Sequence, residues 1–229
     1  MGNLTVNDDA PGSTTVRARR SVYIIDDDSH MRQSLHFLLA SCDIDAWPFA
    51  GCLDFIEQLP QLAPAPIMLD IRMPSIDGLQ MLAILRERTV SWPVIIMTAH
   101  GDVTIAVRAM KLGAIDFLEK PFRPEVLDIV LDQAFSQLDR LEHSTQKRNE
   151  ARDLIGLLSK RESEIVAILM EGAPNKEVAH RLALSIRTVE MHRSNAFAKL
   201  GLRSVAEVVA LVGAADLGSQ GLESVASKA

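Results

Sequence analysis

The segment Ile67-Met68-Leu69-Asp70, followed by Ile71-Arg72-Met73-Pro74, decides how the first part of the chain is interpreted. It is a short apolar run that ends on a carboxylate and is broken soon afterwards by a proline, which predicts a buried β-strand. Asp70 then falls at the carboxyl end of the strand, where open α/β sheets carry their reactive groups. Alone, Asp70 could equally cap the following loop, so the neighbouring strands must decide its role.

Three further apolar runs end on polar or charged side chains. They are residues 22–25 before Asp26-Asp27-Asp28, residues 94–97 before Thr98, and residues 114–118 before Glu119-Lys120-Pro121. If these strands lie parallel in one sheet, their carboxyl ends meet at one edge. The side chains that would converge there are Asp26, Asp27, Asp70, Thr98 and Lys120.

Clustered carboxylates repel one another, since two unit charges about 4 Å apart interact by about 4 kcal/mol at an effective dielectric of 20. They therefore need a cation, and all-oxygen ligands with open positions suit Mg²⁺. Thr98 adds a hydroxyl donor and Lys120 adds a positive charge. Together these groups describe a carboxylate that accepts a phosphoryl group.

The remaining pattern up to residue 140 alternates strand and helix. Ser29 can cap a first helix, residues 44–49 form a second strand, and residues 52–59 and 77–88 form two further helices. Asp102 can cap a fourth helix and Pro124 can begin a fifth. Five alternating strands and helices predict a parallel doubly wound sheet with helices on both faces. Nearly all apolar positions of these helices, among which are Phe37, Val107 and Met110, are expected in the core.

This part of the chain resembles a response regulator receiver domain through four motifs in matching order, namely VYIIDDD, LDIRMPSIDG, IIMTAHGD and DFLEKPF. The resemblance implies a flavodoxin-like α/β fold with strand order 2-1-3-4-5. It also implies that Asp70 is the phosphoacceptor, that a sensor histidine kinase is the partner, and that Mg²⁺ or Mn²⁺ is the cofactor. The implied metal ligands are Asp27, Asp26 through water, Asp70 and the backbone carbonyl of Arg72.

Further roles follow from the same resemblance. Thr98 and Lys120 would bind the phosphoryl oxygens, and Phe117 would move with Thr98 as a switch. The peptide bond between Lys120 and Pro121 is expected to be cis. His100 and Arg72 are placed to affect access of water to the phosphoryl group.

An apolar stripe follows Pro124 at steps of four and three, formed by Leu127, Leu131, Ala134, Leu138 and Leu141. The stripe is about two heptads long, shorter than a coiled coil requires, so two interpretations have nearly equal support. In one, a single extended helix leaves the receiver and helps to pair two chains. In the other, the stripe packs on the receiver's own sheet as far as Phe135 or Leu138.

Residues 157–213 show helical patterns only. Ser159 and Glu162 form a capping box, Gly172 ends the first helix, and a second helix covers residues 175–182. Ser185 can cap a third helix that ends at Gly201, and a fourth spans residues 204–212. Two short helices joined by a tight turn are the geometry that places the second helix in a DNA major groove.

This part resembles the LuxR-type helix-turn-helix over nearly its whole length, from LSKRESEIV to TVEMHRSNAFAKLGL. With the receiver, it resembles the FixJ/NarL family of transcription regulators, and FixJ-type members most. Glu190, Met191 and Ser194 fall where family members touch base edges. Glu accepts from cytosine N4 and Met contacts a thymine methyl group. Phosphate contacts are expected from Arg187, Arg193, Lys199 and Lys176, and the remaining exposed candidates are Thr188 and His192.

Charge and composition agree with this division. Residues 21–140 carry nine Lys or Arg against seventeen Asp or Glu, whereas residues 156–215 carry eight against six. The acidic part argues against nucleic acid binding there, and the mildly basic part permits it. The sequence contains no apolar run of 18 or more residues, so it predicts no membrane-spanning helix. Two cysteines without metal spacing are typical of a cytoplasmic protein.

The expected organisation has five parts: a disordered extension (1–20), a receiver (21–140), a linker or helical continuation of the fifth helix (141–156), the helix-turn-helix domain (157–213) and a flexible tail (214–229). The expected function is a regulator whose DNA binding and homodimerisation are switched by phosphorylation of Asp70. Its partners would be the kinase, promoter DNA and, further, RNA polymerase. The helix at 204–212 is expected to form a dimer contact or to pack within its own domain.

Two other functions stay open. Asp70 could be the nucleophile of an aspartyl phosphatase, but Arg72 stands where such an enzyme needs a general acid, and the second domain would have no role. The chain could instead bind DNA with a receiver that no longer responds to phosphorylation. A regulator that binds a small autoinducer is disfavoured, because the first half carries receiver motifs.

Overall fold

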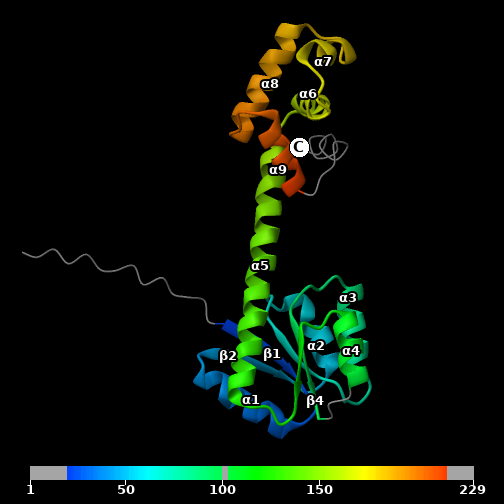
Figure 1. Cartoon of the computed structure of the whole chain (residues 1–229), viewed down its shortest axis with the longest axis vertical. Coiled ribbons are helices and arrows are strands. Elements are labelled where there is room, and N and C mark those ends of the chain that lie inside the picture. The colour runs from blue at the N-terminus through cyan, green and yellow to red at the C-terminus, as the bar shows by residue number, and fades with distance from the viewer. Residues whose placement is uncertain (1–19, 100–102, 216–229) are drawn as a thin grey trace, which may run out of the picture. The chain divides into compact units, whose positions relative to one another are not determined.

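The computed structural model describes residues 20–99 and 103–215, which form two compact units that meet between Leu138 and Asp139 (Figure 1). The N-terminal residues 1–19, the loop with His100 and the expected cap Asp102, and residues 216–229 lie outside this description. No helix within the described ranges is both long and apolar enough to span a membrane.

The first unit is built on a parallel sheet with strand order β2-β1-β3-β4-β5, which confirms the predicted topology. The strands are β1 (Arg20–Ile25), β2 (Ile44–Phe49), β3 (Ile67–Asp70), β4 (Val94–Thr98) and β5 (Asp116–Glu119). Every residue of β3 and β4 is buried, as expected for central strands covered on both faces. Asp70 pairs with Met97 and Thr98 pairs with Glu119, so the register carries the polar strand ends to one edge.

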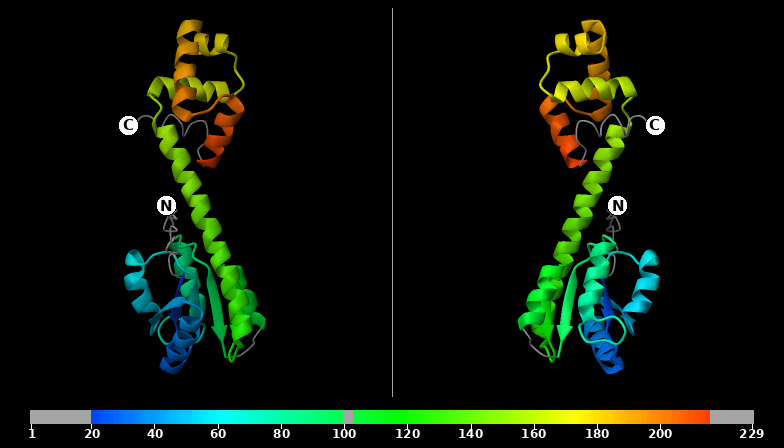
Figure 2. Two further views of the ribbon diagram at one scale, coloured as in Figure 1. Left: turned by 90° about the vertical axis from the view of Figure 1, so that its left-hand side faces the viewer. Right: turned by 90° about the vertical axis from the view of Figure 1, so that its right-hand side faces the viewer.

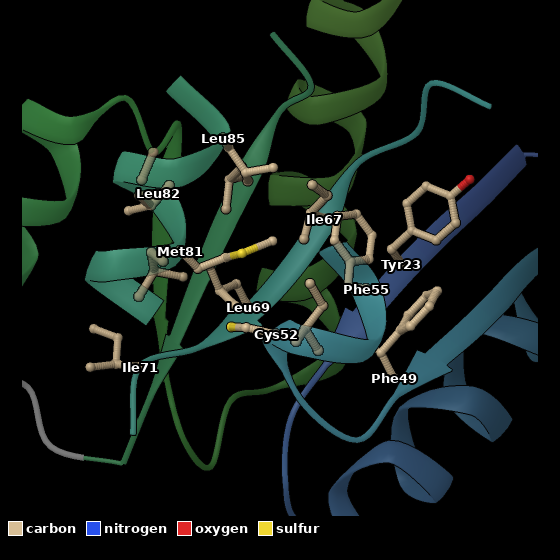
Figure 3. Close-up of a cluster of buried hydrophobic side chains, with 14 of the residues drawn as sticks. Tyr23, Phe49, Cys52, Phe55, Ile67, Leu69, Ile71, Met81, Leu82 and Leu85 are labelled. Carbon is tan, nitrogen blue, oxygen red and sulfur yellow. The ribbon is translucent and has the colours of Figure 1, made fainter. Parts of the chain in front are cut away.

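Helices cover both faces of the sheet (Figure 2). On one face lie α2 (Cys52–Gln58), a 3₁₀ turn (Leu59–Gln61), α3 (Gly78–Glu87) and α4 (Val103–Leu112), and on the other lie α1 (Ser29–Ser41) and the start of α5 (Pro124–Gly156). The core under α2 and α3 is aromatic at one end, where Tyr23, Phe49 and Phe55 pack edge to face (Figure 3). The peptide bond between Lys120 and Pro121 is cis, as predicted.

Three local predictions were wrong. The N-cap of α1 is Asp28, whose carboxylate accepts from the backbone N–H groups of His30 and Met31, and Ser29 is the first helical residue. Val107 and Met110 on α4 are 46% and 47% exposed, and Phe37 on α1 is 66% exposed. Helical periodicity identified an apolar side of each helix, but these three side chains lie outside the core of the first unit.

The helix α5 is continuous from Pro124 to Gly156. Its first part packs on the sheet of the first unit through Leu127, Leu131 and Ala134, as the second interpretation expects. Its continuity agrees with the single extended helix of the first interpretation, whose pairing of two chains stays a prediction. Its last part supplies Ala151 and Ile155 to the core of the second unit. Residues 141–156, expected as a linker or as a helical continuation of the fifth helix, are helical and belong to the second unit.

The second unit contains α6 (Lys160–Met170), α7 (Asn175–Arg181), α8 (Ile186–Leu200) and α9 (Val205–Ala214). Ser159 and Glu162 form the predicted capping box of α6, and Ser185 caps α8, which ends at Gly201 with a φ of 69°. On α9, Val208 and Val212 pack into the unit's own core, whereas Val209 is 44% exposed. Ala215 is also buried, although it was assigned to the tail.

We predict that Ile155→Ala destabilises the second unit by about 2–5 kcal/mol, because it removes a fully buried side chain from that core. Native-state hydrogen exchange should show the loss in α6 and α8, with the receiver strands unchanged. Asp153→Ala, an exposed change two residues away, should stay within about 0.5 kcal/mol. Equal protection of α6 and α8 in both variants would show that α5 is only a connector.

Candidate functional site

The polar ends of the strands line one open cavity of about 440 Å³ at the carboxyl edge of the sheet. Asp26 and Asp27 follow β1, Asp70 ends β3, Thr98 ends β4, and Lys120 follows β5. The cavity wall is completed by Asp28, Met31, Arg72, Ala99 and Pro121. All five side chains that were predicted to converge are therefore together.

Lys120 joins the two buried carboxylates of this cavity. Its Nζ lies 2.6 Å from Asp26 Oδ2 and 2.6 Å from Asp70 Oδ1. The side chains of Asp26 and Asp70 keep only 1% and 9% of their exposure. Two buried like charges are tolerated only with a counter-charge, and the ammonium group supplies it.

The pKa values of this cluster follow from burial and charge. Burial raises the pKa of Asp70, and the hydrogen bond and charge of Lys120 offset this only in part. Burial also acts to lower the pKa of Lys120, but its hydrogen bonds to Asp26 and Asp70 outweigh that effect and raise it. Lys120 is therefore a permanent cation at neutral pH, and the charge of Asp70 depends on it.

Backbone groups orient the remaining carboxylate oxygens. The N–H of Arg72 donates to Asp70 Oδ2 at 2.8 Å, and the N–H of Asp28 donates to Asp26 Oδ1 at 2.9 Å. The guanidinium of Arg32 donates to the backbone carbonyl of Asp26 at 2.6 Å. The sequence did not identify Arg32 as part of the site, because a single arginine in the first turns of a helix has the same pattern as an ordinary solvent-exposed arginine.

Gly78 was missed as well, although it shapes the loop that follows Asp70. Its N–H donates to the carbonyl of Ile71 at 2.9 Å. A Cβ at this position would lie 2.5 Å from the backbone oxygen of Asp70 and 2.9 Å from the Cα of Ile71. The start of α3 thus packs directly on the backbone of the phosphoacceptor candidate, which only glycine allows.

A divalent metal is chemically compatible with the donors here. The carboxylates of Asp26, Asp27 and Asp70 share the cavity with Arg72, an all-oxygen set of the kind Mg²⁺ prefers once the Arg72 carbonyl is included. Within residues 20–99 and 103–215, no three acidic, histidine or cysteine side chains converge closely enough to hold a metal as they stand. Lys120, between Asp26 and Asp70, accounts for this arrangement.

Phe117 does not line this cavity. It is 40% exposed and borders an apolar depression with residues of α4, namely Val103, Ala106, Val107, Met110 and Lys111. Thr98 is buried at 6% exposure and lines the acidic cavity. Phe117 pairs in register with Ile96, two residues before Thr98 on β4, so one strand connects the two predicted switch residues.

The second candidate site is the exposed side of α8. Arg187, Glu190, Met191 and Ser194 are exposed and follow the spacing i, i+3, i+4, i+7 of one helix face. The opposite side is buried through Val189, Ala196, Phe197 and Leu200. The helix is therefore held by its apolar side and presents a polar row.

The other predicted DNA contacts differ in their surroundings. Lys176 is exposed on α7, His192 is half-buried, and the Thr188 hydroxyl lies 2.7 Å from the Ser185 hydroxyl. Arg193 lies over the Phe197 ring, 5.3 Å from its centroid. Lys199 donates to Glu162 at 2.7 Å, so its charge is already paired.

We predict that Gly78→Ala lowers the free energy of unfolding of the first unit by about 1–3 kcal/mol, because the added methyl group meets backbone atoms that cannot swing away. Hydrogen exchange of the β3 and β4 amides would report it. The matched control is Gly213→Ala in α9, where the methyl group meets nothing within 4 Å. There the same change should stabilise its own unit by about 0.5–1 kcal/mol. Unchanged protection of β3 in Gly78→Ala would contradict the packing argument.

Comparison with known proteins matches both units. The family model of the response regulator receiver domain covers residues 22–132, and that of the bacterial regulatory proteins of the luxR family covers residues 156–212. Transcriptional regulatory protein FixJ of Bradyrhizobium diazoefficiens is 38% identical over 190 residues, which are 83% of this chain and 93% of that protein. The C4-dicarboxylate transport transcriptional regulatory protein DctR of Rhodobacter capsulatus is 38% identical over 82% of this chain and 96% of its own length.

Solved structures agree. The response regulator StyR has a TM-score of 0.75 at 32% identity and covers 86% of this chain and 99% of its own. Full-length FixJ from B. japonicum has a TM-score of 0.55 at 36% identity, with 87% and 98% covered. The chain therefore belongs to the FixJ-type response regulators, the transcription regulators of two-component systems that combine a receiver domain with a LuxR-family DNA-binding domain.

Proposed function

We propose that phosphoryl transfer from a sensor histidine kinase to Asp70 switches promoter binding by the second unit. The observation that carries this proposal is the Lys120 ammonium, which lies 2.6 Å from a buried Asp70 oxygen at the base of an open acidic cavity. An aspartate that is nearly buried, charged and reachable from solvent is suited to accept a group from a partner protein. Membership of a two-component family supplies the class of donor.

In the transfer, an Asp70 oxygen attacks the phosphorus of a phosphohistidine. The new oxygen–phosphorus bond forms as the phosphorus–nitrogen bond breaks. The electron pair stays on that nitrogen, and the ring leaves as neutral imidazole because its other nitrogen already carries a proton. Lys120 and the Thr98 hydroxyl, which line the same cavity, would donate to the phosphoryl oxygens. Mg²⁺ or Mn²⁺, held by Asp26, Asp27, Asp70 and the Arg72 carbonyl, would neutralise charge on those oxygens. Attack of water on the acyl phosphate would later break its bond to Asp70 and release inorganic phosphate, and Arg72 would affect the access of that water.

Phosphorylation adds about −1.5 to −2 charges beside Lys120 and Thr98. Thr98 would move toward the new oxygens, and Phe117 on the neighbouring strand would follow. Phe117 borders the exposed apolar residues of α4, so the change would reach a surface that can pair two receivers or release the DNA-binding unit. Converting a 1:99 equilibrium to 99:1 takes about 5.5 kcal/mol of differential stabilisation.

On DNA, the exposed row of α8 would enter the major groove. Glu190 would accept from cytosine N4, Met191 would contact a thymine methyl group, and Ser194 would add a hydroxyl. Arg187, Arg193 and Lys176 would hold phosphates, with Thr188 and His192 at the margin. Two chains, paired through the exposed Val209 of α9 or through the receivers, would bind a site with two symmetric halves.

We predict that Mg²⁺ and acetyl phosphate convert the native chain to a dimer with about 5- to 150-fold tighter DNA binding, as expected for typical coupling energies of 1–3 kcal/mol. The measurements are mass in solution and affinity for a duplex that the native chain selects from a randomised pool. Asp70→Asn, which keeps the shape of the side chain, should not respond. Chelation of Mg²⁺ should abolish the response of the native chain.

Equal response of the native chain and Asp70→Asn would overturn the switch at Asp70 and favour a regulator with an inert receiver. Release of phosphate from many small phosphoesters with rapid turnover would instead favour a phosphatase.

A further inference from the structure

Glu162 is a nearly buried carboxylate that connects two helices of the second unit. Its Oε2 accepts the backbone N–H of Ser159 at 2.8 Å and the Nζ of Lys199 at 2.7 Å. The Glu162 side chain keeps 5% of its exposure, whereas Lys199 keeps 41%. Ser159 precedes α6 and Lys199 lies in the last turn of α8, so the ion pair ties the start of α6 to the end of α8.

The pair is placed where both helix ends favour it. An acidic group is stabilised at a helix N-terminus and a basic group at a helix C-terminus. Burial acts to raise the pKa of Glu162, but the hydrogen bonds from Lys199 and Ser159 and the charge of Lys199 outweigh it and lower the pKa. Glu162 is therefore ionised at neutral pH. If Lys199 turned away to a DNA phosphate, it would leave a buried carboxylate without its counter-charge, which is strongly unfavourable.

Lys199 also lies outside the exposed row of α8. The row of Arg187, Glu190, Met191 and Ser194 continues, at the same helical spacing, to Ala198. At about 100° per residue, the five residues from Ser194 to Lys199 turn the side chain by about 140°. Lys199 thus faces α6 while the row faces away from it.

We propose that Glu162 and Lys199 are positioning residues for DNA reading, which fix the direction of α8 through their ion pair, and that Lys199 holds no DNA phosphate. This inference rests on the proposed DNA binding. Arg187 lies twelve residues from Lys199, about 18 Å along the helix axis. A small tilt of α8 at the ion pair therefore displaces the N-terminal end of the helix, which carries Arg187, more than it displaces the end near Lys199. Contacts with bases depend on the direction of α8, whereas contacts with phosphates tolerate a small tilt of the helix.

The test uses the full-length chain with Mg²⁺ and acetyl phosphate, the duplex selected by the native chain, and a scrambled duplex, over a range of salt concentrations. The variants are Glu162→Gln, which can still cap α6, and Lys199→Gln. Both should weaken binding to the selected duplex by a similar factor of about ten, within the range for the loss of a base contact. Both should leave the scrambled duplex and the slope of log Kd against log salt unchanged. The double variant should be no weaker than either single variant, because each change removes the same pair.

Arg187→Gln is the matched control for a phosphate contact. It should weaken both duplexes alike and lower the salt slope by about one. If Lys199→Gln also weakened both duplexes alike and lowered the salt slope, the inference would be wrong. Tighter DNA binding by Glu162→Gln, in which Lys199 loses its partner, would also overturn it. Hydrogen exchange in α6 and α8 identifies a variant that fails to fold, in which case the other variant decides. A native chain that selects no sequence would overturn the proposed DNA binding itself, and this inference with it.

Discussion

The receiver depends on one cation that is mostly shielded from solvent, since the Lys120 side chain keeps only 12% of its exposure. Lys120 holds the carboxylates of Asp26 and Asp70 at 2.6 Å each, in a place where neither would be stable alone. The sheet register, the loop after β5 and the packing of Gly78 on the Asp70 backbone all serve to place these three side chains. Negative charge added at Asp70 would therefore act on Lys120 first, and the proposed switch passes from there to Thr98 and Phe117.

The second unit repeats the same physical solution for a different purpose. Glu162 is buried, charged and matched by Lys199, and it joins α6 to the helix that carries the exposed polar row. In both units a buried ion pair specifies the direction of an element more than it stabilises the core. Apolar packing determines that the helices associate, and the pair determines the angle at which the outer side chains are presented.

The strand ends and the exposed row of α8 could be predicted because they depend on local patterns. Apolar runs that end on carboxylates, and polar residues at helical spacing, are visible in a single sequence. The pair of Glu162 and Lys199, separated by 37 residues, and the approach of Gly78 to Asp70 depend on tertiary packing that no local pattern encodes. Val107 and Met110 show the converse, since their apolar spacing is helical but both are about half exposed and border a depression beside Phe117. The burial of Ala151 and Ile155 could not be read from the polar residues around them.

The central claim is that Asp70, among the clustered carboxylates, receives the phosphoryl group. The most direct measurement is to incubate the native chain with Mg²⁺ and acetyl phosphate, reduce the acyl phosphate with borohydride, and locate the mass change by peptide mass spectrometry. The account predicts modification at Asp70, and its loss in Asp70→Asn. Modification at Asp26 or Asp27 in the native chain, or an unchanged yield in Asp70→Asn, would contradict it.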